Sequence, residues 1–186
     1  MPNWCECDLT IHGPDVSAVL AAVRSEGREF DFNNLIPYPE EYRQLDELSW
    51  EYSRQFNAIA DDDPRRDEKL AALAHEFGVK HGEPWLRDGY NSGGYEWCCD
   101  HWATKWNSSQ IVVETNPDEP RSAVIHFDTA WCPPLPVIRV LAKRFPDHEF
   151  CLEYFEGGVG FCGELKLDGG TELSHWFDDY DGPRGG

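Results

Sequence analysis

Apolar and polar residues alternate along several short stretches of the chain, and a period of two is typical of a strand with one buried face. In residues 3–11, every second side chain from Cys5 through Leu9 to Ile11 is an apolar group or a thiol, while acidic and hydroxyl side chains take the other face. The same alternation predicts further strands at residues 30–36, 111–113, 123–129, 150–154 and 160–167.

Between these strands, apolar residues recur every three or four positions, which predicts helices. One helix follows Asp15, whose side chain can cap it, and carries an apolar stripe from Val16 to Val23. Another begins after two prolines at Leu135 and ends at Phe145. Residues 40–94 carry two further stripes separated by an acidic break, and they predict a helical insertion.

The resulting order is strand, helix, strand, helical insertion, two strands, helix and two strands. Two strand-helix-strand units on one sheet are the split βαβ pattern of a ferredoxin-like α+β fold, with both helices on one face. A length of 186 residues fits a single domain, 1–186, with the helical insertion at 40–94. The polar segment 168–186 is expected to be a flexible acidic tail.

The chain is strongly acidic, with 35 Asp and Glu against 16 Lys and Arg and a formal net charge of -19. Such a chain repels a phosphate backbone, so direct nucleic-acid binding is not expected. The same charge attracts basic surfaces, and the expected partner is a host protein with a basic surface. Two acidic runs predict the docking surface, and they comprise Asp61, Asp62, Asp63, Asp178 and Asp179. The alternative is that the charge serves only solubility.

The sequence shows no membrane-spanning run and no leader with a basic region followed by an apolar one, so we expect a cytoplasmic protein without membrane contact. Its seven cysteines are odd in number, and in that compartment they are expected to be reduced and to pack as small apolar groups. A zinc site is the alternative, with the possible ligands Cys5, Cys7, Cys98, Cys99 and His101. Their spacing suits packing better, so no metal or cofactor is predicted.

The segment after the insertion is rich in tryptophan. Buried indoles need partners for their N–H groups, so some of these rings are expected to line a partly open groove where they can stack on a ligand or hold a cation. The predicted binding residues are Trp102, Thr104, Lys105, Trp106 and Trp131, with Trp97 nearby in sequence. The alternative is that the indoles fill the seam between the sheet and the insertion.

His126 and Asp128 are two positions apart on one predicted strand, so their side chains point the same way. Beside Trp131 they could form a small acid-base site, and we include them among the predicted binding residues. The alternative is an ordinary solvated face. Since the sequence contains no nucleotide-binding loop, nucleophile elbow or metalloprotease pattern, an enzyme is not expected.

Five segments of the chain have a familiar pattern: Met1-Pro2-Asn3-Trp4-Cys5, residues 30–37, residues 101–107, residues 129–134 and residues 155–163. Together they resemble the YubB-like family of phage and plasmid proteins, which carries a ferredoxin-like domain. Members of that family commonly have Asn-Trp-Gly-Thr-Lys-Trp where this chain has His-Trp-Ala-Thr-Lys-Trp at residues 101–106. The resemblance implies an accessory protein of a mobile element in a bacterial cytoplasm, and it implies no established reaction.

Three functions are compatible with these features. The first is an acidic protein that binds a host protein and inhibits a nucleic-acid-targeting defence system, of the anti-CRISPR or anti-restriction type, by electrostatic mimicry. The second is an RNA or single-strand binding module that uses the sheet face, although exposed Glu6 and Asp8 disfavour it. The third is a small-molecule enzyme or sensor built on the tryptophans. The sequence favours the first and leaves the oligomeric state open.

Overall fold

The structure is a computed structural model that describes residues 3–180. The chain divides into two compact units. The sheet unit comprises Met1–Pro37 and Glu96–Gly186, and the helical unit comprises Tyr38–Tyr95. The expected insertion at 40–94 therefore falls inside a segment that is compact by itself.

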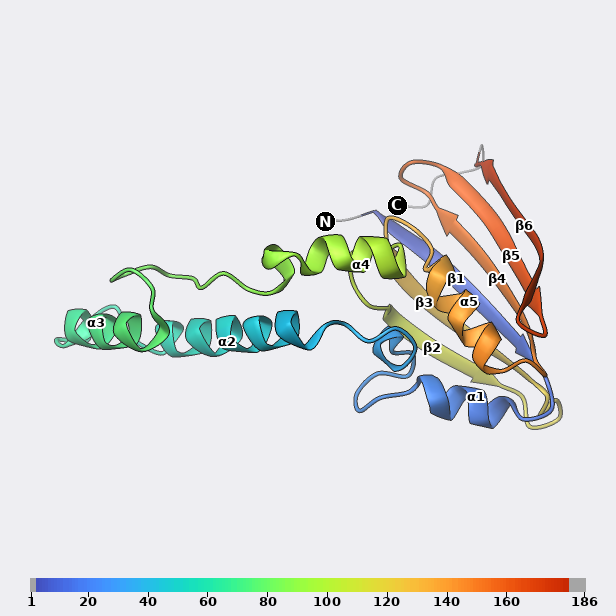
Figure 1. Cartoon of the computed structure of the whole chain (residues 1–186), viewed down its shortest axis with the longest axis horizontal. Coiled ribbons are helices and arrows are strands. Elements are labelled where there is room, and N and C mark those ends of the chain that lie inside the picture. The colour runs from blue at the N-terminus through green and yellow to red at the C-terminus, as the bar shows by residue number, and fades with distance from the viewer. Residues whose placement is uncertain (1–2, 181–186) are drawn as a thin grey trace. The chain divides into compact units, whose positions relative to one another are not determined.

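The sheet unit contains one six-stranded sheet in the order β2-β3-β1-β4-β5-β6, and every neighbouring pair is antiparallel (Figure 1). The strands are β1 (Trp4–His12), β2 (Ser109–Thr115), β3 (Ser122–Ala130), β4 (Glu149–Glu156), β5 (Phe161–Asp168) and β6 (Thr171–Asp179). The four strands β4-β1-β3-β2, with α1 (Val16–Val23) after β1 and α5 (Leu135–Arg144) after β3, form the ferredoxin-like core. The fold is thus ferredoxin-like α+β, and β5 and β6 widen the sheet beyond β4.

Both α1 and α5 lie on the same face of the sheet (Figure 1). A row of four side chains crosses the covered face on neighbouring strands, and each of the four is 0% exposed: Ile125, Leu9, Leu152 and Leu165. The opposite face, which we call the open face, carries the alternate side chains. On β1 these are exposed at Trp4, Glu6, Asp8 and His12. The alternation that predicted the strands therefore separates the core from this open face.

The expected strand at residues 30–36 is wrong. This segment contains a short 3-10 helix, Phe32–Asn34, and its Phe30 and Phe32 side chains are both fully buried. The Asp31 side chain caps the turn by accepting a hydrogen bond from the backbone N–H of Asn33, 2.9 Å away. Such a bond from a side chain to the nearby backbone competes with pairing in a sheet, so the two aromatic rings reach the core from a turn.

The expectation of a flexible tail at 168–186 is also wrong for the part that the structure describes. β6 pairs with β5 over its whole length, and the Tyr154 hydroxyl of β4 lies 3.0 Å from Nε2 of His175 on β6. Every residue of β6 is exposed, so its composition does not reveal its strand character. Residues 181–186 of the expected tail lie outside the described residues.

The helical unit consists of α2 (Glu40–Asn57), α3 (Arg66–Phe77) and the 3-10 helix Tyr90–Ser92. Tyr52 is the centre of its packing, because its ring is 1% exposed and its centroid lies 5.3 Å from that of Phe77. Its hydroxyl donates to the carbonyl of Glu83, which ties the returning chain to α2. Helix α4 (Gly94–Trp102) begins at the end of this unit. In the described part of the chain, no helix is long and apolar enough to cross a membrane.

Candidate docking surface

The open face of the sheet is strongly acidic. The strand registers place nine carboxylates on it: Glu6, Asp8, Glu114, Asp128, Glu149, Glu153, Glu164, Asp168 and Asp178. Among the described strand residues of this face, Lys166 is the one Lys or Arg, and His12 and His126 are the histidines. Nine of the 35 acidic residues of the chain therefore share this face with a single Lys or Arg among its described strand residues.

Several of these carboxylates face each other directly across neighbouring strands. The register pairs Glu6 with Asp128, Asp8 with Glu153, Glu153 with Glu164 and Glu149 with Asp168. Like charges directly opposite each other destabilise a sheet, so the open face contains four unfavourable pairs.

Burial and repulsion both disfavour the ionised form of Asp128. Desolvation by the surrounding residues is the main cause that raises the pKa of the Asp128 carboxyl, and the negative charge of Glu6 raises it further. Because a raised pKa means that the ionised form is disfavoured in the fold, the charge on Asp128 lowers the stability of the folded protein at neutral pH.

His126, on the same strand as Asp128, partly neutralises the charge of Asp8 on β1. Its Nδ1 lies 2.6 Å from Oδ1 of Asp8, and its Nε2 lies 3.7 Å from Oε2 of Glu114. The hydrogen bond with Asp8 is the main cause that raises the pKa of His126, so the imidazolium form is favoured in the fold. His126 thus interacts with Asp8 on the neighbouring strand rather than with Asp128 on its own strand.

We expect this histidine to give the protein a pH-dependent stability. A raised folded-state pKa stabilises the fold below the ordinary histidine pKa of about 6.5, and the gain is lost as the pH rises through the raised value. The free energy of unfolding of the wild type, minus that of His126→Gln, should therefore fall as the pH rises from about 6.5 through the raised pKa of His126. Asp8→Asn should lower the pKa of His126 in an NMR titration. An unchanged titration in Asp8→Asn would contradict this account.

Glu164 is the most enclosed charged group that pairs on this face, with a side chain only 16% exposed. It accepts a hydrogen bond from Nζ of Lys166 at 2.8 Å and one from the indole N–H of Trp176 at 3.2 Å. The bond with Lys166 is the main cause that lowers the pKa of Glu164, so this carboxylate stays ionised. A shallow depression of about 320 Å³ lies nearby, with Asp8, Glu153 and Trp176 among its lining residues.

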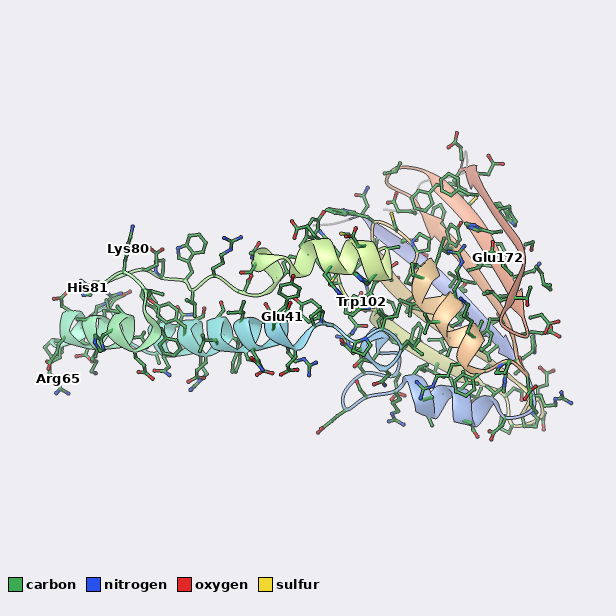
Figure 2. All side chains as sticks on the ribbon, in the orientation of Figure 1. Glu41, Arg65, Lys80, His81, Trp102 and Glu172 are labelled. Atoms are coloured by element: carbon green, nitrogen blue, oxygen red, sulfur yellow. The ribbon has the colours of Figure 1, made fainter. Side chains whose placement is uncertain are left out.

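Two of the predicted binding residues belong to the core instead of a groove. Trp102, at the end of α4 (Figure 2), is 3% exposed and donates its indole N–H to the carbonyl of Ile36 at 2.9 Å. Thr104 is 2% exposed and donates to the carbonyl of Ala130 at 2.9 Å. Their polar atoms are occupied inside the protein, so neither can contact a ligand without a rearrangement.

The other two tryptophans among the predicted binding residues, Trp106 and Trp131, both contact Lys105. The Nζ atom of Lys105 lies 4.1 Å from the ring centroid of Trp106 and 3.8 Å from that of Trp131. Trp4 flanks the pair, with its ring centroid 6.3 Å from that of Trp106. We call Trp106 and Trp131 the tryptophan cage. Since Trp4 is the first open-face residue of β1 and pairs with Ala130, the cage borders the end of the open face.

The predicted acidic docking residues belong to both units of the chain. Asp61, Asp62 and Asp63 belong to the helical unit, where Asp61 pairs with Arg66 at 3.0 Å and Asp63 pairs with Lys69. Asp178 and Asp179 belong to β6 and, as neighbours on a strand, point to opposite faces. Of these five, Asp178 shares the open face with the other carboxylates.

The cysteines considered as zinc ligands are distributed between β1 and α4. Cys5 and Cys7 are buried with their sulfurs 4.0 Å apart, while Nδ1 of His101 lies 2.9 Å from the carbonyl of Trp97. Within residues 3–180, no three His, Cys, Asp or Glu side chains are grouped so that they could hold a metal ion.

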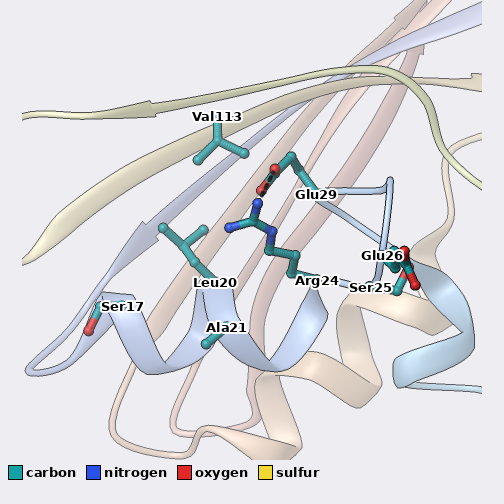
Figure 3. A pocket seen from close by; sticks show the side chains of 8 residues that line it. All are labelled: Ser17, Leu20, Ala21, Arg24, Ser25, Glu26, Glu29 and Val113. Carbon is teal, nitrogen blue, oxygen red and sulfur yellow. Dashed lines mark ion pairs between the residues drawn. The ribbon is translucent and has the colours of Figure 1, made fainter.

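A larger hollow, of about 590 Å³, lies between α1 and the β2 edge of the sheet (Figure 3). It is lined by Leu20, Val113 and several polar side chains, and Arg24 crosses it to pair with Glu29 at 3.0 Å. The ion pair occupies the charged groups of Arg24 and Glu29. The hollow therefore offers no convergent set of free polar groups for a substrate.

Sequence reasoning overlooked the open face as a unit, although the signal was present in the alternation. Glu6 and Asp8 were placed on the polar face of the first strand, and the same test applied to residues 149–168 assigns Glu153 and Glu164 to polar positions. What the alternation cannot supply is the order of strands in the sheet, which decides that these acids face each other.

Comparisons with known proteins support the fold. Residues 101–182 match a family model described as "Ferredoxin-like domain in Api92-like protein". Among solved structures, the crystal structure of a protein api92 from Yersinia pseudotuberculosis is similar over 98% of this chain and 99% of that chain, with a TM-score of 0.55 and 12% sequence identity. No curated protein matches the chain significantly. These matches give no support to a YubB-like, phage or plasmid name. Over residues 101–182, the chain is therefore similar to the ferredoxin-like domain of Api92-like proteins.

Proposed function

We propose that this protein is a binding module that docks on a positively charged protein surface through the open face of its sheet. The observation that carries the proposal is the set of four like-charge pairs on neighbouring strands. If solubility alone were at stake, the same number of acids could be spread over the surface without facing each other.

Features that lower stability and are confined to one surface are characteristic of functional sites, because binding compensates for them. A cationic partner would neutralise both members of each pair at once. The repulsion on the open face then becomes a driving force for association, since it is relieved only in the complex.

For the partner class, we propose a protein that itself binds nucleic acid, such as an effector of a host defence system. The carboxylates form rows with a spacing of about 4.8 Å between strands and about 6.8 Å along a strand, so they present a dense array of anions to a phosphate-binding groove. The resemblance to the YubB-like family adds the setting of a mobile element in a bacterial cytoplasm. Inhibition would follow from occupation of the groove.

A triple variant, Asp128→Asn, Glu153→Gln and Asp168→Asn, tests the docking surface because it removes one member of every like-charge pair. The matched control carries Glu26→Gln, Glu119→Gln and Asp147→Asn, which are exposed in turns of the sheet unit. Both variants change the formal net charge from -19 to -16, since each replaces three acids. The probe is a fluorescent peptide of about eight arginines, measured by anisotropy at low salt.

The open-face variant should bind this peptide about tenfold more weakly than the wild type, while the control should change by less than about threefold. Equal weakening in both variants would mean that only net charge matters and would refute the docking surface. A wild type that does not bind the peptide at low salt would refute it as well. The partner class is tested with proteins that the immobilised wild type captures from a bacterial lysate. Duplex DNA should release these proteins, and their retention in the presence of DNA would refute mimicry.

The open face counts against the alternative of an RNA or single-strand binding module. Such modules combine aromatic rings with basic residues on the exposed sheet, whereas here acids surround Phe155 and Trp176. Titration with short oligonucleotides should leave the tryptophan fluorescence unchanged.

A further inference from the structure

The tryptophan cage holds a lysine by ring faces alone. Both indole centroids lie within 4.1 Å of Nζ of Lys105, well inside the range of a cation-π contact. In the part of the chain that the structure describes, no carboxylate forms an ion pair with this lysine, although acids exceed bases 35 to 16 in the sequence. The two rings therefore hold the Lys105 ammonium without the help of an opposite charge.

The backbone around the cage is held in an uncommon conformation. Ala103 has a φ of 62° and Trp131 has a φ of 74°, a region that disfavours residues other than glycine. The N–H of Trp131 is fixed by the carbonyl of Asn3 at 3.0 Å. In addition, the indole nitrogen of Trp106 is buried without a hydrogen-bond partner among the described residues. The loops thus hold these rings at a cost in stability.

The cage is also accessible to a partner. Trp131 is 43% exposed and Trp4 is 38% exposed, so one side of the cluster faces solvent. Trp4 is two positions from Glu6 on the same face of β1, which places the cage next to the carboxylates of the open face. A cationic side chain that approaches the open face would therefore reach the indoles as well.

We infer that the tryptophan cage is a binding site for an arginine side chain of the partner, and that Lys105 occupies this site until the partner displaces it. A guanidinium suits the site because it is planar, stacks on indole faces and is less strongly hydrated than an ammonium. This inference rests on the proposed function: the cage would add a specific contact to the electrostatic attraction that the open-face carboxylates exert on the same partner. Lys105, once displaced, returns to solvent, which favours a long and flexible side chain at that position.

Substitution of Lys105 tests the cage with a small probe, N-acetyl-arginine amide, which is too small to report on the whole open face. Lys105→Ala vacates the space between the rings, whereas Lys105→Met fills it without a charge. In NMR titrations of the indole N–H groups, Lys105→Ala should bind the probe with a Kd about tenfold lower than that of the wild type. Lys105→Met should bind no better than the wild type, and Lys143→Ala serves as the control for loss of a lysine.

If Lys105→Ala binds no more tightly than Lys105→Met, the rings only hold a structural lysine and the inference fails. If Lys105→Ala does not unfold cooperatively, Trp131→Ala is the variant that tests the cage. Trp131→Ala should bind the arginine peptide about fivefold more weakly than the wild type, with an unchanged salt dependence of binding. An unchanged affinity for the peptide would refute the cage. Binding of the small probe by Lys105→Ala, when the wild type does not bind the peptide, would support the cage and refute the proposed function.

Discussion

The open-face variant, Asp128→Asn with Glu153→Gln and Asp168→Asn, should unfold at a higher urea concentration than the wild type. It relieves four like-charge pairs, each of which costs a few tenths of a kcal/mol or more, so we expect a gain of about 1 to 3 kcal/mol at neutral pH. Asp128 contributes through its raised pKa, because its ionised form is disfavoured in the fold.

The pH dependence of this gain gives a second readout. The contribution from Asp128→Asn should disappear as the pH falls below the ordinary aspartate pKa of about 3.9, where Asp128 is protonated in the folded and unfolded chain alike. The free energy of unfolding of the control variant, with Glu26→Gln, Glu119→Gln and Asp147→Asn, should differ from that of the wild type by less than about 0.5 kcal/mol. A destabilised open-face variant would show that the carboxylates stabilise the sheet, and the argument for a functional surface would fail.

Leu152→Ala should destabilise the sheet unit by about 3 to 4 kcal/mol. Leu152 is 0% exposed and lies between Leu9 and Leu165 in the row that crosses the covered face. Its truncation leaves a cavity where strands on both sides hold the backbone in place, so collapse is limited. Urea unfolding followed by circular dichroism measures the effect, with an unchanged m-value as the sign that the folded structure is retained.

The matched control for this substitution is Leu173→Ala on β6, which is 66% exposed and should change the stability by less than about 0.5 kcal/mol. A loss of similar size at both positions would show that β6 is covered in solution by another part of the chain or by another molecule. A small loss in Leu152→Ala would contradict the assignment of the core to this row.

The proposed docking on the open face implies that the charge of this protein is informative only through its placement. Asp61 and Asp63 belong to the most acidic run of the sequence, yet each pairs with a nearby cation. Glu153, by contrast, is flanked by Asp8 and Glu164 on both neighbouring strands. Local neutralisation leaves little field for a partner, as where Asp8 pairs with His126 and Glu164 with Lys166. Glu153 forms no ion pair among the described residues, so its charge leaves a stronger field.

Prediction from the sequence succeeded where local pattern decides structure. The alternation in β1, β3, β4 and β5 located these strands, because one of their faces is buried and the other is exposed. It failed for β6, which is exposed on both faces, and for residues 30–36, where buried Phe30 and Phe32 are carried by a turn. Periodicity records burial on one side of an element, so it misses a strand without a buried side and misreads a turn that buries two alternate rings.

For the candidate site, too, the sequence predicts the local features and the structure decides the contacts between distant residues. That Glu6 and Asp8 are exposed, and that Lys105 stands beside Trp106, follows from the sequence alone. Whether Glu6 meets Asp128, or Lys105 meets Trp131, depends on which strands and loops become neighbours. The sequence by itself therefore determined the fold class, the strand faces and the excess of charge. Only the tertiary structure decided that acids face acids and that two indoles enclose a lysine, because both depend on contacts between residues far apart in the chain.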